Sequence, residues 1–342
     1  MRILIVHNDY GKYSGEEAVV DCMIADARRV GFEIETLRRT SKFSRENLWG
    51  KIHGFFASIW SISSRRMMRE ALHTFKPDIV HIHNLYPFIS PAVLPICHKS
   101  GVPVIMTVHN YRLICPTGLF LRDGKPCENC LRNGNELDCI RYNCEHDYFR
   151  SFGYALRNMV ARRTRAYLDN VDFFCCITEF QRQKLIEAGF PKERVKVMSN
   201  YVAYVEPEEP NKETKSWGTE YIGYVGRLSY EKGYDMLLEV ARRHPEIKFC
   251  IAGAIRNDDQ IDFPSNVQRC GQLSAERLAR FYENASFIVI PSRCYEGFPL
   301  VLIESALHGC CCVAPNHGAF PDLMSDKETK EIGGLLFNPL DI

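Results

Sequence analysis

The sequence predicts an α/β protein of two domains, each built on a parallel, doubly wound sheet with helices on both faces. Three observations lead to this fold class. The chain has 342 residues, which is more than one hydrophobic core normally serves. Short runs rich in β-branched residues alternate with helical patterns in both halves, as is typical of parallel sheets with crossover helices. Between the halves, residues 204–217 are charged and contain proline, which is the composition of a linker.

The first half is expected to begin with a strand at residues 2–7 and a glycine-containing loop at 11–15. A helix at 16–30 follows and ends at Gly31, because glycine commonly terminates helices. Further strands of this half are predicted at residues 33–38, 78–83, 102–108 and 173–177.

The second half repeats the alternation of strand and helix. Strands are predicted at residues 221–226, 247–252, 287–290 and 311–314, and helices at 235–244, 275–283 and from Pro299 onward. We therefore predict two Rossmann-like domains, residues 1–203 and 204–342, facing each other across a cleft at the carboxyl ends of their strands. Sheets of this kind bind ligands at that edge.

Composition excludes several classes of protein. The net charge is +1, so nothing in the overall charge favours a nucleic-acid partner. The first residues lead directly into a strand, and the longest apolar stretches, such as 54–62, fall short of the roughly 20 residues that span a membrane. Many of the 15 cysteines, such as Cys250, lie in apolar segments and read as reduced core residues. We expect a cytoplasmic protein.

The most informative motif runs from Glu296 to Glu304. Pro299 suits the first turn of a helix, Gly309 reads as its end, and the free N–H groups at the start of a helix favour an anion such as phosphate. Glu304, about one turn into the helix, can accept hydrogen bonds from sugar hydroxyls. The motif therefore predicts a nucleotide-sugar site, although a solvated amphipathic helix with two chance carboxylates explains the pair alone equally well.

A second motif, at residues 226–233, follows the first strand of the second half. It places Arg227 and Lys232 on a loop bounded by glycines. A guanidinium can hold a diphosphate through two hydrogen bonds and an ammonium adds a point charge, and such groups stabilise the charge on a departing diphosphate. Taken alone, the loop reads as a solvated basic turn.

Together these motifs resemble the retaining glycosyltransferases of family 4, the group 1 glycosyl transferases that have the two-domain GT-B fold. The resemblance extends over nearly the whole chain, and the glutamate spacing and the basic loop are its most specific parts. The segments that carry it are residues 14–17, 77–84, 107–110, 199–200, 226–233, 251–253 and 291–304.

The resemblance implies a role for each matching residue. Arg227 and Lys232 would hold the donor diphosphate, and Glu304 would bind the ribose hydroxyls. Glu296 would bind hydroxyls of the transferred sugar, and His109 would lie beside that sugar near the reacting carbon. Catalysis is thus expected to depend on His109, Glu296, Arg227 and Lys232, without a catalytic metal. Further contacts to the donor are implied for Gly15, Gly297, Phe298 and Leu300.

The resemblance predicts an enzyme that moves a sugar from a nucleotide-diphosphate sugar to a glycan or lipid-linked glycan in polysaccharide or surface-glycan biosynthesis. The alternatives are a nucleotide-sugar epimerase of the same architecture and a catalytically silent, glycan-binding relative. Members of the family usually continue through further helices beyond the position of Ile342, so we expect the second domain to lack its last helices.

Five cysteines crowd a loop-rich insert at about residues 115–146. Cys127 and Cys130 have the two-residue spacing of half a tetrahedral zinc site, and the polar segment around them has too few apolar residues to form a core. We predict one structural Zn²⁺, with free thiols in a surface loop as the alternative. Resemblance to a subgroup with a similar insert implies Cys115, Cys127, Cys130 and Cys144 as ligands, while local spacing equally allows Cys139.

Two further features leave alternatives open. His81 and His83 alternate along a strand and face the same side, and we favour hydrogen-bonded or cleft-lining imidazoles over a metal pair. Segments 48–69 and 152–167 combine aromatic residues with arginines, which suits a peripheral position on the inner face of a membrane and equally suits aromatics packed on the sheet. These residues are Trp49, Phe55, Phe56, Ile59, Trp60, Ile62, Arg65, Arg66 and Arg69, and Arg157, Arg162, Arg163 and Arg165.

Overall fold

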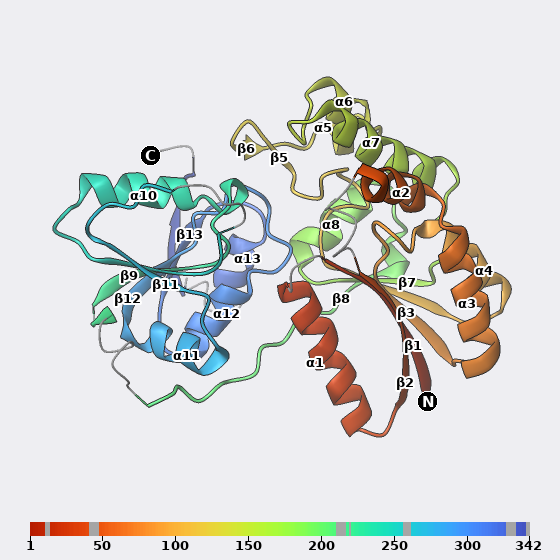
Figure 1. Ribbon diagram of the computed structural model, residues 1–342, viewed down its shortest axis with the longest axis horizontal. Coiled ribbons are helices and arrows are strands. Elements are labelled where there is room, and N and C mark those ends of the chain that lie inside the picture. Colours follow the sequence, from red (N-terminus) through yellow and green to blue (C-terminus); the bar gives the residue numbers. More distant parts are fainter. Residues whose placement is uncertain are drawn as a thin grey trace. The chain divides into compact units, whose positions relative to one another are not determined.

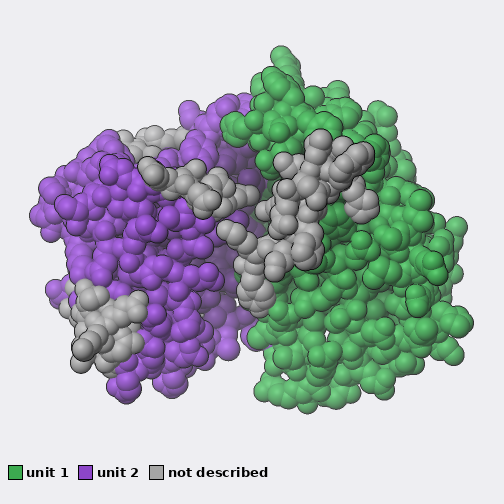
Figure 2. Space-filling model, in the orientation of Figure 1, with its two compact units in different colours: residues 1–118, 128–200 green, residues 119–127, 201–342 purple. Residues whose placement is uncertain are grey.

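The computed structural model describes residues 1–10, 14–40, 48–209, 217–218, 220–255, 261–325 and 333–339, and only the backbone of 48–53. The chain divides into two compact units, shown in different colours in Figure 2. Unit 1 comprises residues 1–118 and 128–200, and unit 2 comprises residues 119–127 and 201–342. Each unit holds a six-stranded sheet with parallel pairing, so the predicted class of two parallel-sheet α/β domains is confirmed.

The sheet of unit 1 has the strand order β2-β1-β3-β4-β7-β8. Its strands are β1 (Arg2–Asp9), β2 (Glu33–Thr40), β3 (Ile79–Asn84), β4 (Val104–Val108), β7 (Phe173–Cys176) and β8 (Val195–Val197). Its helices are α1 (Gly15–Arg29), α2 (Leu48–Ile59), α3 (Ile62–Phe75), α4 (Leu94–Lys99), α5 (Asn129–Arg132), α6 (Leu137–Arg141), α7 (Tyr148–Arg163) and α8 (Glu179–Glu187).

The central strands of unit 1 are buried because helices cover both faces of the sheet. In Figure 1, α1 lies on one face and α3 and α4 lie on the other. Strand β1 accordingly has five consecutive buried residues, the pattern of a strand covered on both sides. The helical conformation is interrupted at Trp60, between α2 and α3. The Ser61 hydroxyl caps α3 by accepting from the Ser64 N–H at 3.3 Å.

The sheet of unit 2 has the strand order β11-β10-β9-β12-β13-β14. Its strands are β9 (Tyr221–Val225), β10 (Phe249–Ala252), β11 (Val267–Gly271), β12 (Ala285–Val289), β13 (Cys312–Pro315) and β14 (Gly334–Phe337). Its helices are α10 (Tyr234–Arg243), α11 (Ala275–Asn284), α12 (Leu300–Leu307) and α13 (Phe320–Met324). A short antiparallel hairpin, β5 (Leu121–Arg122) and β6 (Lys125–Pro126), also belongs to this unit.

Two hydrophobic cores fill the faces of the second sheet. Leu237 and Leu238 of α10 pack on one face, and Phe281 of α11 and Leu302 of α12 pack on the other (Figure 1). Cysteine contributes to this packing as predicted, because Cys250, Cys310 and Cys312 are buried, but Cys311 is exposed and is not a core residue. Within the part of the chain that is described, no helix is long and apolar enough to cross a bilayer.

Candidate active site

In unit 2, the polar residues that the sequence singled out gather around the start of α12. The helix begins at Leu300, with Pro299 as its N-cap residue rather than a residue of the first turn. Gly297 and Phe298 are half-buried in the loop just before it. The helix ends at Leu307, and Gly309 follows with a φ of +70°, so the predicted stop at this glycine is confirmed.

Glu296, in this loop, forms a close ion pair with Lys232, which lies in the loop after β9. The Lys232 Nζ lies 2.6 Å from Oε1 and 2.8 Å from Oε2 of Glu296, and the Ser292 hydroxyl donates to Oε1 as well. Burial alone would raise the pKa of Glu296, but the Lys232 ammonium and these hydrogen bonds hold it below its ordinary value. Burial likewise opposes the charge on Lys232, and the carboxylate raises the pKa of that ammonium. Both side chains are therefore charged near neutral pH.

Arg227 extends from the same loop as Lys232 and is more exposed. Its guanidinium lies 3.7 Å from the Glu231 carboxylate, and 56% of its side chain is accessible. The turn depends on glycine, because Gly253 on the neighbouring loop has a φ of +145° and a Cβ there would lie 1.8 Å from the carbonyl oxygen of Gly226. Glycine therefore lets the two loops pack closely, and the accessible Arg227 guanidinium lies within electrostatic range of the Lys232–Glu296 pair, an arrangement suited to an anionic ligand.

Glu304 lies in α12 and is held by a neighbouring aromatic side chain. The Tyr282 hydroxyl donates to its Oε2 at 2.7 Å. Burial raises the pKa of Glu304, although the Tyr282 bond and the nearby His308 act in the opposite direction. The two carboxylates are therefore stabilised differently: Glu296 forms an ion pair with the Lys232 ammonium, whereas Glu304 accepts a hydrogen bond from an uncharged hydroxyl.

In unit 1, four histidines cluster at the carboxyl ends of β1, β3 and β4. His83 Nδ1 lies 2.8 Å from His109 Nε2, and His81 Nε2 lies 2.8 Å from the Thr107 hydroxyl. The rings of His81 and His83 are 4.3 Å apart, and those of His7 and His83 are 6.3 Å apart. The predicted placement of His81 and His83 on one side of the strand as hydrogen-bonded imidazoles is confirmed.

Burial keeps all four imidazoles uncharged near neutral pH. It lowers the pKa of His7 and of His81 to about 4, and it holds the pKa of His83 well below the ordinary value of 6.5. It also lowers the pKa of His109, against the opposing charge of Glu16. These rings therefore serve as hydrogen-bonding groups rather than as cations.

A small cavity of about 20 Å³ lies beside the histidines. Its polar lining is His83, Asn84, Tyr86, His109, Asn110, Arg112 and Tyr167. One part of its surroundings was not predicted from the sequence: Arg112 donates to the Tyr10 hydroxyl at 2.7 Å, and that hydroxyl donates to Glu16 at 2.9 Å. Glu16 directly follows Gly15, which is predicted to contact the sugar donor and is exposed at the start of α1. This position next to Gly15 is the sequence feature that could have pointed to Glu16 as a site residue.

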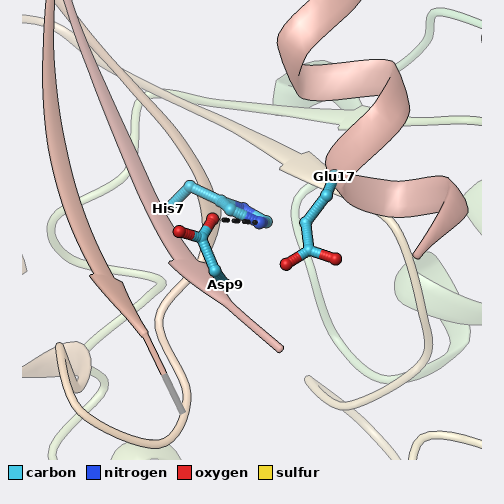
Figure 3. A group of neighbouring side chains, drawn as sticks. All are labelled: His7, Asp9 and Glu17. Atoms are coloured by element: carbon cyan, nitrogen blue, oxygen red, sulfur yellow. Dashed lines mark ion pairs between the residues drawn. The ribbon is translucent and has the colours of Figure 1, made fainter. Parts of the chain in front are cut away.

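Figure 3 shows a group of three potential metal ligands at the start of this unit. Among the described residues, His7, Asp9 and Glu17 have ligand atoms within 4.8 Å of one another. Asp9 lies 3.2 Å from Arg38, and Glu17 accepts from the backbone N–H groups of Tyr10 and Ser14 as part of a helix capping box. Existing contacts account for both carboxylates, so the group needs no metal to explain it.

The predicted zinc ligands lie in two segments. Cys115, Cys130, Cys139 and Cys144 belong to unit 1, whereas Cys127 belongs to the 119–127 segment of unit 2. Burial and the neighbouring thiols of Cys115 and Cys144 raise the pKa of Cys130 to about 12. Two causes raise the pKa of Cys139: mainly a hydrogen bond with Cys144, and also burial of the thiol. Within unit 1, Cys139 therefore hydrogen-bonds Cys144, and Cys130 lies within electrostatic range of Cys115 and Cys144.

The arginines of segment 152–167 are not all solvated. Arg157 is buried between the rings of Tyr86 and Tyr154, at 4.3 and 4.0 Å, and Arg162 pairs with Glu136 at 2.8 Å. In the other segment, the apolar side chains of Phe56, Trp60 and Ile62 are exposed, whereas Phe55 is partly buried. Trp49 lies outside the described side chains.

Two family profiles match the chain in succession. Residues 27–203 match the profile described as Glycosyltransferase Family 4, and residues 205–340 match the profile described as Glycosyl transferases group 1. The chain therefore belongs to Glycosyltransferase Family 4, as the motif resemblance predicted, and it is a glycosyltransferase.

Curated relatives are similar over about half to four fifths of the chain at low identity. An uncharacterized 42.6 kDa protein in the cps region of Klebsiella pneumoniae is 26% identical over 292 residues, which cover 82% of this chain and 68% of that protein. A 41.2 kDa protein in the cps region of the same organism is 31% identical over 163 residues, covering 45% of this chain and 44% of that protein. Sulfoquinovosyl transferase SQD2 of Arabidopsis thaliana is 25% identical over 276 residues, covering 78% of this chain and 48% of SQD2. The chain thus spans about half the length of the last two relatives.

Solved structures share the fold. HepE of Anabaena in complex with UDP-glucose has a TM-score of 0.61 at 14% identity, covering 99% of this chain and 86% of HepE. Sucrose-phosphate synthase of Thermosynechococcus elongatus has a TM-score of 0.67 at 15% identity, with the same coverage of 99% and 86%. At these identities the likeness establishes the GT-B fold.

Proposed function

We propose that this protein is a retaining hexosyltransferase that moves a sugar from a nucleotide-diphosphate sugar to a glycan or lipid-linked glycan in polysaccharide or surface-glycan biosynthesis. The observation that carries the proposal is the ion pair between Glu296, in the loop before α12, and Lys232, in the loop after β9, with Arg227 on the same loop as Lys232. Two comparisons support it: HepE was solved with UDP and with UDP-glucose, and two relatives are encoded in cps regions.

Each residue of this group has a chemical task in the proposal. Arg227 and Lys232 balance the negative charge that grows on the diphosphate as it departs. The N–H groups of Gly297, Phe298 and Leu300 lie at the start of a helix, which favours an anion. Glu296 accepts hydrogen bonds from hydroxyls of the transferred sugar. Glu304 accepts from the ribose hydroxyls.

The reaction proposed is a front-face displacement. The bond from the anomeric carbon to the diphosphate oxygen breaks, and the acceptor oxygen bonds to the same face of that carbon. The departing phosphate oxygen takes the acceptor proton, so no separate base is required. A neutral His109, as burial favours, then acts as a hydrogen-bonding group beside the sugar and does not add a positive charge.

A thermal-shift screen against UDP-, GDP-, ADP- and dTDP-sugars tests the donor site. We expect one nucleotide sugar to raise the Tm, and we expect Arg227→Ala to abolish that rise. Arg243→Ala is the matched control, because Arg243 is a surface arginine paired with Glu239 on α10, and it should keep the rise. No rise with any donor from folded protein would contradict the proposal, and an inverted anomer in the product would contradict retention.

We also propose that unit 1 binds an anionic membrane surface through an exposed aromatic face. Phe55 of α2 stacks on Phe149 of α7 at 5.2 Å, and this contact holds the exposed residues of both helices together. The face consists of Phe56, Trp60, Ile62, Tyr148, Phe149 and Phe152, with Arg66 and Arg69 exposed nearby. Exposed aromatics beside basic residues suit a lipid interface.

Flotation with anionic phospholipid vesicles at low salt tests this face. Phe56→Ser with Trp60→Ser should abolish co-flotation, whereas Val240→Ser, at a partly exposed apolar position on α10, should not. Unchanged flotation of the double variant, or no binding by the wild type, would overturn the membrane proposal without affecting the donor site.

A structural Zn²⁺ in the cysteine insert remains our proposal. The ligands would be Cys115, Cys130 and Cys144, with Cys127 as the resemblance implies or Cys139 as the contacts within unit 1 favour. The ion would order a segment that has little apolar core. Zinc analysis of protein purified without a metal-affinity tag should give about one equivalent. Loss of zinc in Cys127→Ser or in Cys139→Ser would identify the fourth ligand, and less than a few tenths of an equivalent in the wild type would exclude the site.

A further inference from the structure

The short contact between His83 and His109 contains a choice of proton position. Nδ1 of His83 and Nε2 of His109 lie 2.8 Å apart, and the rings are nearly parallel with centroids 5.1 Å apart. Since burial keeps both imidazoles neutral, each ring carries one proton. One of the two facing nitrogens must therefore donate and the other must accept.

The surroundings of His83 decide between the two arrangements. His83 is 4% exposed, and its other nitrogen, Nε2, is buried without a hydrogen-bond partner. If His109 donated, the His83 proton would sit on this Nε2, and a buried N–H would be left without an acceptor. If His83 donates from Nδ1, Nε2 is left only with a lone pair. Buried donors without partners are rarer than under-satisfied acceptors, so the second arrangement is favoured.

The outer nitrogen of His109 is placed differently. Its Nδ1 has no described hydrogen bond, and it is not among the buried polar atoms that lack a partner. His109 lines the small cavity described above together with Asn110 and Arg112. Its Nδ1 is therefore not fully buried and has an open hydrogen-bonding position.

We propose that His83 is a positioning residue that donates its Nδ1–H to Nε2 of His109, fixing the His109 proton on Nδ1 so that this accessible nitrogen donates a hydrogen bond to a substrate hydroxyl oxygen. The hydroxyl part rests on the proposed function, because it takes the molecule that reaches this nitrogen to be a sugar. The tautomer itself depends only on the contacts of the two rings.

This arrangement has a chemical consequence. With its accessible nitrogen protonated and its other nitrogen bonded to His83, His109 has no free lone pair with which to accept a proton. It acts as an oriented donor rather than as a general base. This agrees with a reaction in which the departing phosphate oxygen takes the acceptor proton.

Histidine-labelled protein and long-range ¹H–¹⁵N NMR read the tautomer directly. The His109 signals are assigned by their disappearance in His109→Asn. We expect the Nδ1 of His109 to have the shift of a protonated ring nitrogen and its Nε2 that of a bare nitrogen, with His83 likewise protonated at Nδ1. A protonated Nε2 on His109 would overturn the proposal.

Two variants of His83 separate positioning from packing. His83→Asn retains an N–H near the place of the ring Nδ1 and should keep the His109 tautomer and keep kcat within about three-fold. His83→Leu has no donor and should lower kcat about ten-fold while changing the donor KM less than about two-fold. Equal turnover in the Asn and Leu variants would contradict the positioning role.

Ser64→Ala is the matched control, because Ser64 is a buried residue of unit 1 outside the histidine group, and its hydroxyl donates to the Phe88 carbonyl at 2.8 Å. It should lower the Tm as His83→Leu does but leave the His109 shifts and kcat essentially unchanged. The expected tautomer together with absence of any sugar transfer would refute the proposed function and leave the positioning of His109 intact. The opposite tautomer in an active enzyme would do the reverse.

Discussion

The two units place polar groups at the carboxyl edges of similar sheets, yet they manage charge in opposite ways. In unit 1 the group consists of His7, His81, His83 and His109, and burial keeps these rings neutral. In unit 2, Glu296 is similarly protected from solvent, with 11% of its side chain exposed, but it stays ionised because Lys232 lies 2.6 Å away. One unit presents neutral donors and acceptors, and the other presents fixed charges.

This difference suits two kinds of ligand. Fixed charges stabilise a diphosphate, whose charge increases as it leaves. Neutral imidazoles bind hydroxyl groups without attracting anions, and their hydrogen bonds have a direction set by tautomer. Because ion pairs and desolvated neutral rings respond differently to substitution and to acid, the comparison can be tested.

The largest effect is expected when the ion pair in unit 2 is broken. Lys232→Ala leaves the Glu296 carboxylate without its cation, and Glu296→Gln removes the charge that holds Lys232. Each should lower kcat/KM about 100-fold or more, and Lys232→Ala should also cost roughly 3 kcal/mol of stability. Steady-state kinetics and urea unfolding measure the two effects.

Arg243→Ala is the control for this prediction. Arg243 pairs with Glu239 at 2.9 Å on the exposed side of α10, where such a pair contributes about 0.3–0.5 kcal/mol.

The double variant Lys232→Ala/Glu296→Gln should be little worse than either single variant, because the two residues act as a unit. Independent, additive losses would mean that the pair seen between them has no functional weight.

Acid should loosen unit 1 before it disrupts the pair in unit 2. The unfolded chain protonates His7 near its ordinary pKa of 6.5, but the folded chain protonates it only near pH 4. Stability is therefore complete above pH 6.5 and falls as the pH drops toward 4, by on the order of 3 kcal/mol for His7 alone. Glu296 has a pKa lowered from 4.5, so its contribution persists above pH 4.5 and is lost only below it.

Hydrogen exchange followed peptide by peptide distinguishes the units. Peptides of β1 and β3 should lose protection between about pH 6.5 and 4, while peptides that carry Lys232 and Glu296 should keep theirs longer. Unit 2 contributes His317, whose pKa burial also lowers, so it will not be insensitive. His7→Asn, which cannot be protonated there, should flatten the response of unit 1. Earlier loss of protection in unit 2 would reverse the comparison.

The sequence predicted the parts of the molecule whose signal is local. Buried strands such as β1 and β10 were recognised from continuous apolar runs, and residues 296–304 formed a motif within nine residues of chain. Five short or edge strands, β5, β6, β8, β11 and β14, were not predicted. The reason is physical: β8 has two exposed residues of three, and β11 has one buried residue of five, so neither has the apolar pattern of a covered strand.

The site contacts were out of reach for the same reason. Lys232 and Glu296 are 64 residues apart, His83 and His109 are 26 apart, and Tyr10 and Arg112 are 102 apart. Each residue could be assigned a role from its own motif, but which residues pair depends on the order of strands in the sheet. The motifs identified Glu296 and Lys232 as separate site residues, and only the fold shows that the two form an ion pair.

The smallest expected effect concerns Glu304, which burial leaves with a raised pKa despite the bond from Tyr282. Tyr282→Phe removes a hydroxyl that donates to Oε2 at 2.7 Å, which should raise the pKa of Glu304 further and weaken donor binding by about 1 kcal/mol. We expect the donor KM to increase about five-fold, and the loss should grow as the pH falls.

Tyr221→Phe is the matched control for this substitution, because Tyr221 is buried in the same core and its hydroxyl donates to the Phe281 carbonyl at 2.8 Å. Both variants lose one buried hydroxyl and should lose similar stability, but only Tyr282→Phe changes a carboxylate assigned to the donor. An equal increase in KM in both variants would trace the effect to the stability of unit 2 as a whole. A rise in KM confined to Tyr282→Phe would show that unit 2 sets the ionisation of Glu296 and Glu304 by separate means, the first by a cation and the second by a neutral hydroxyl.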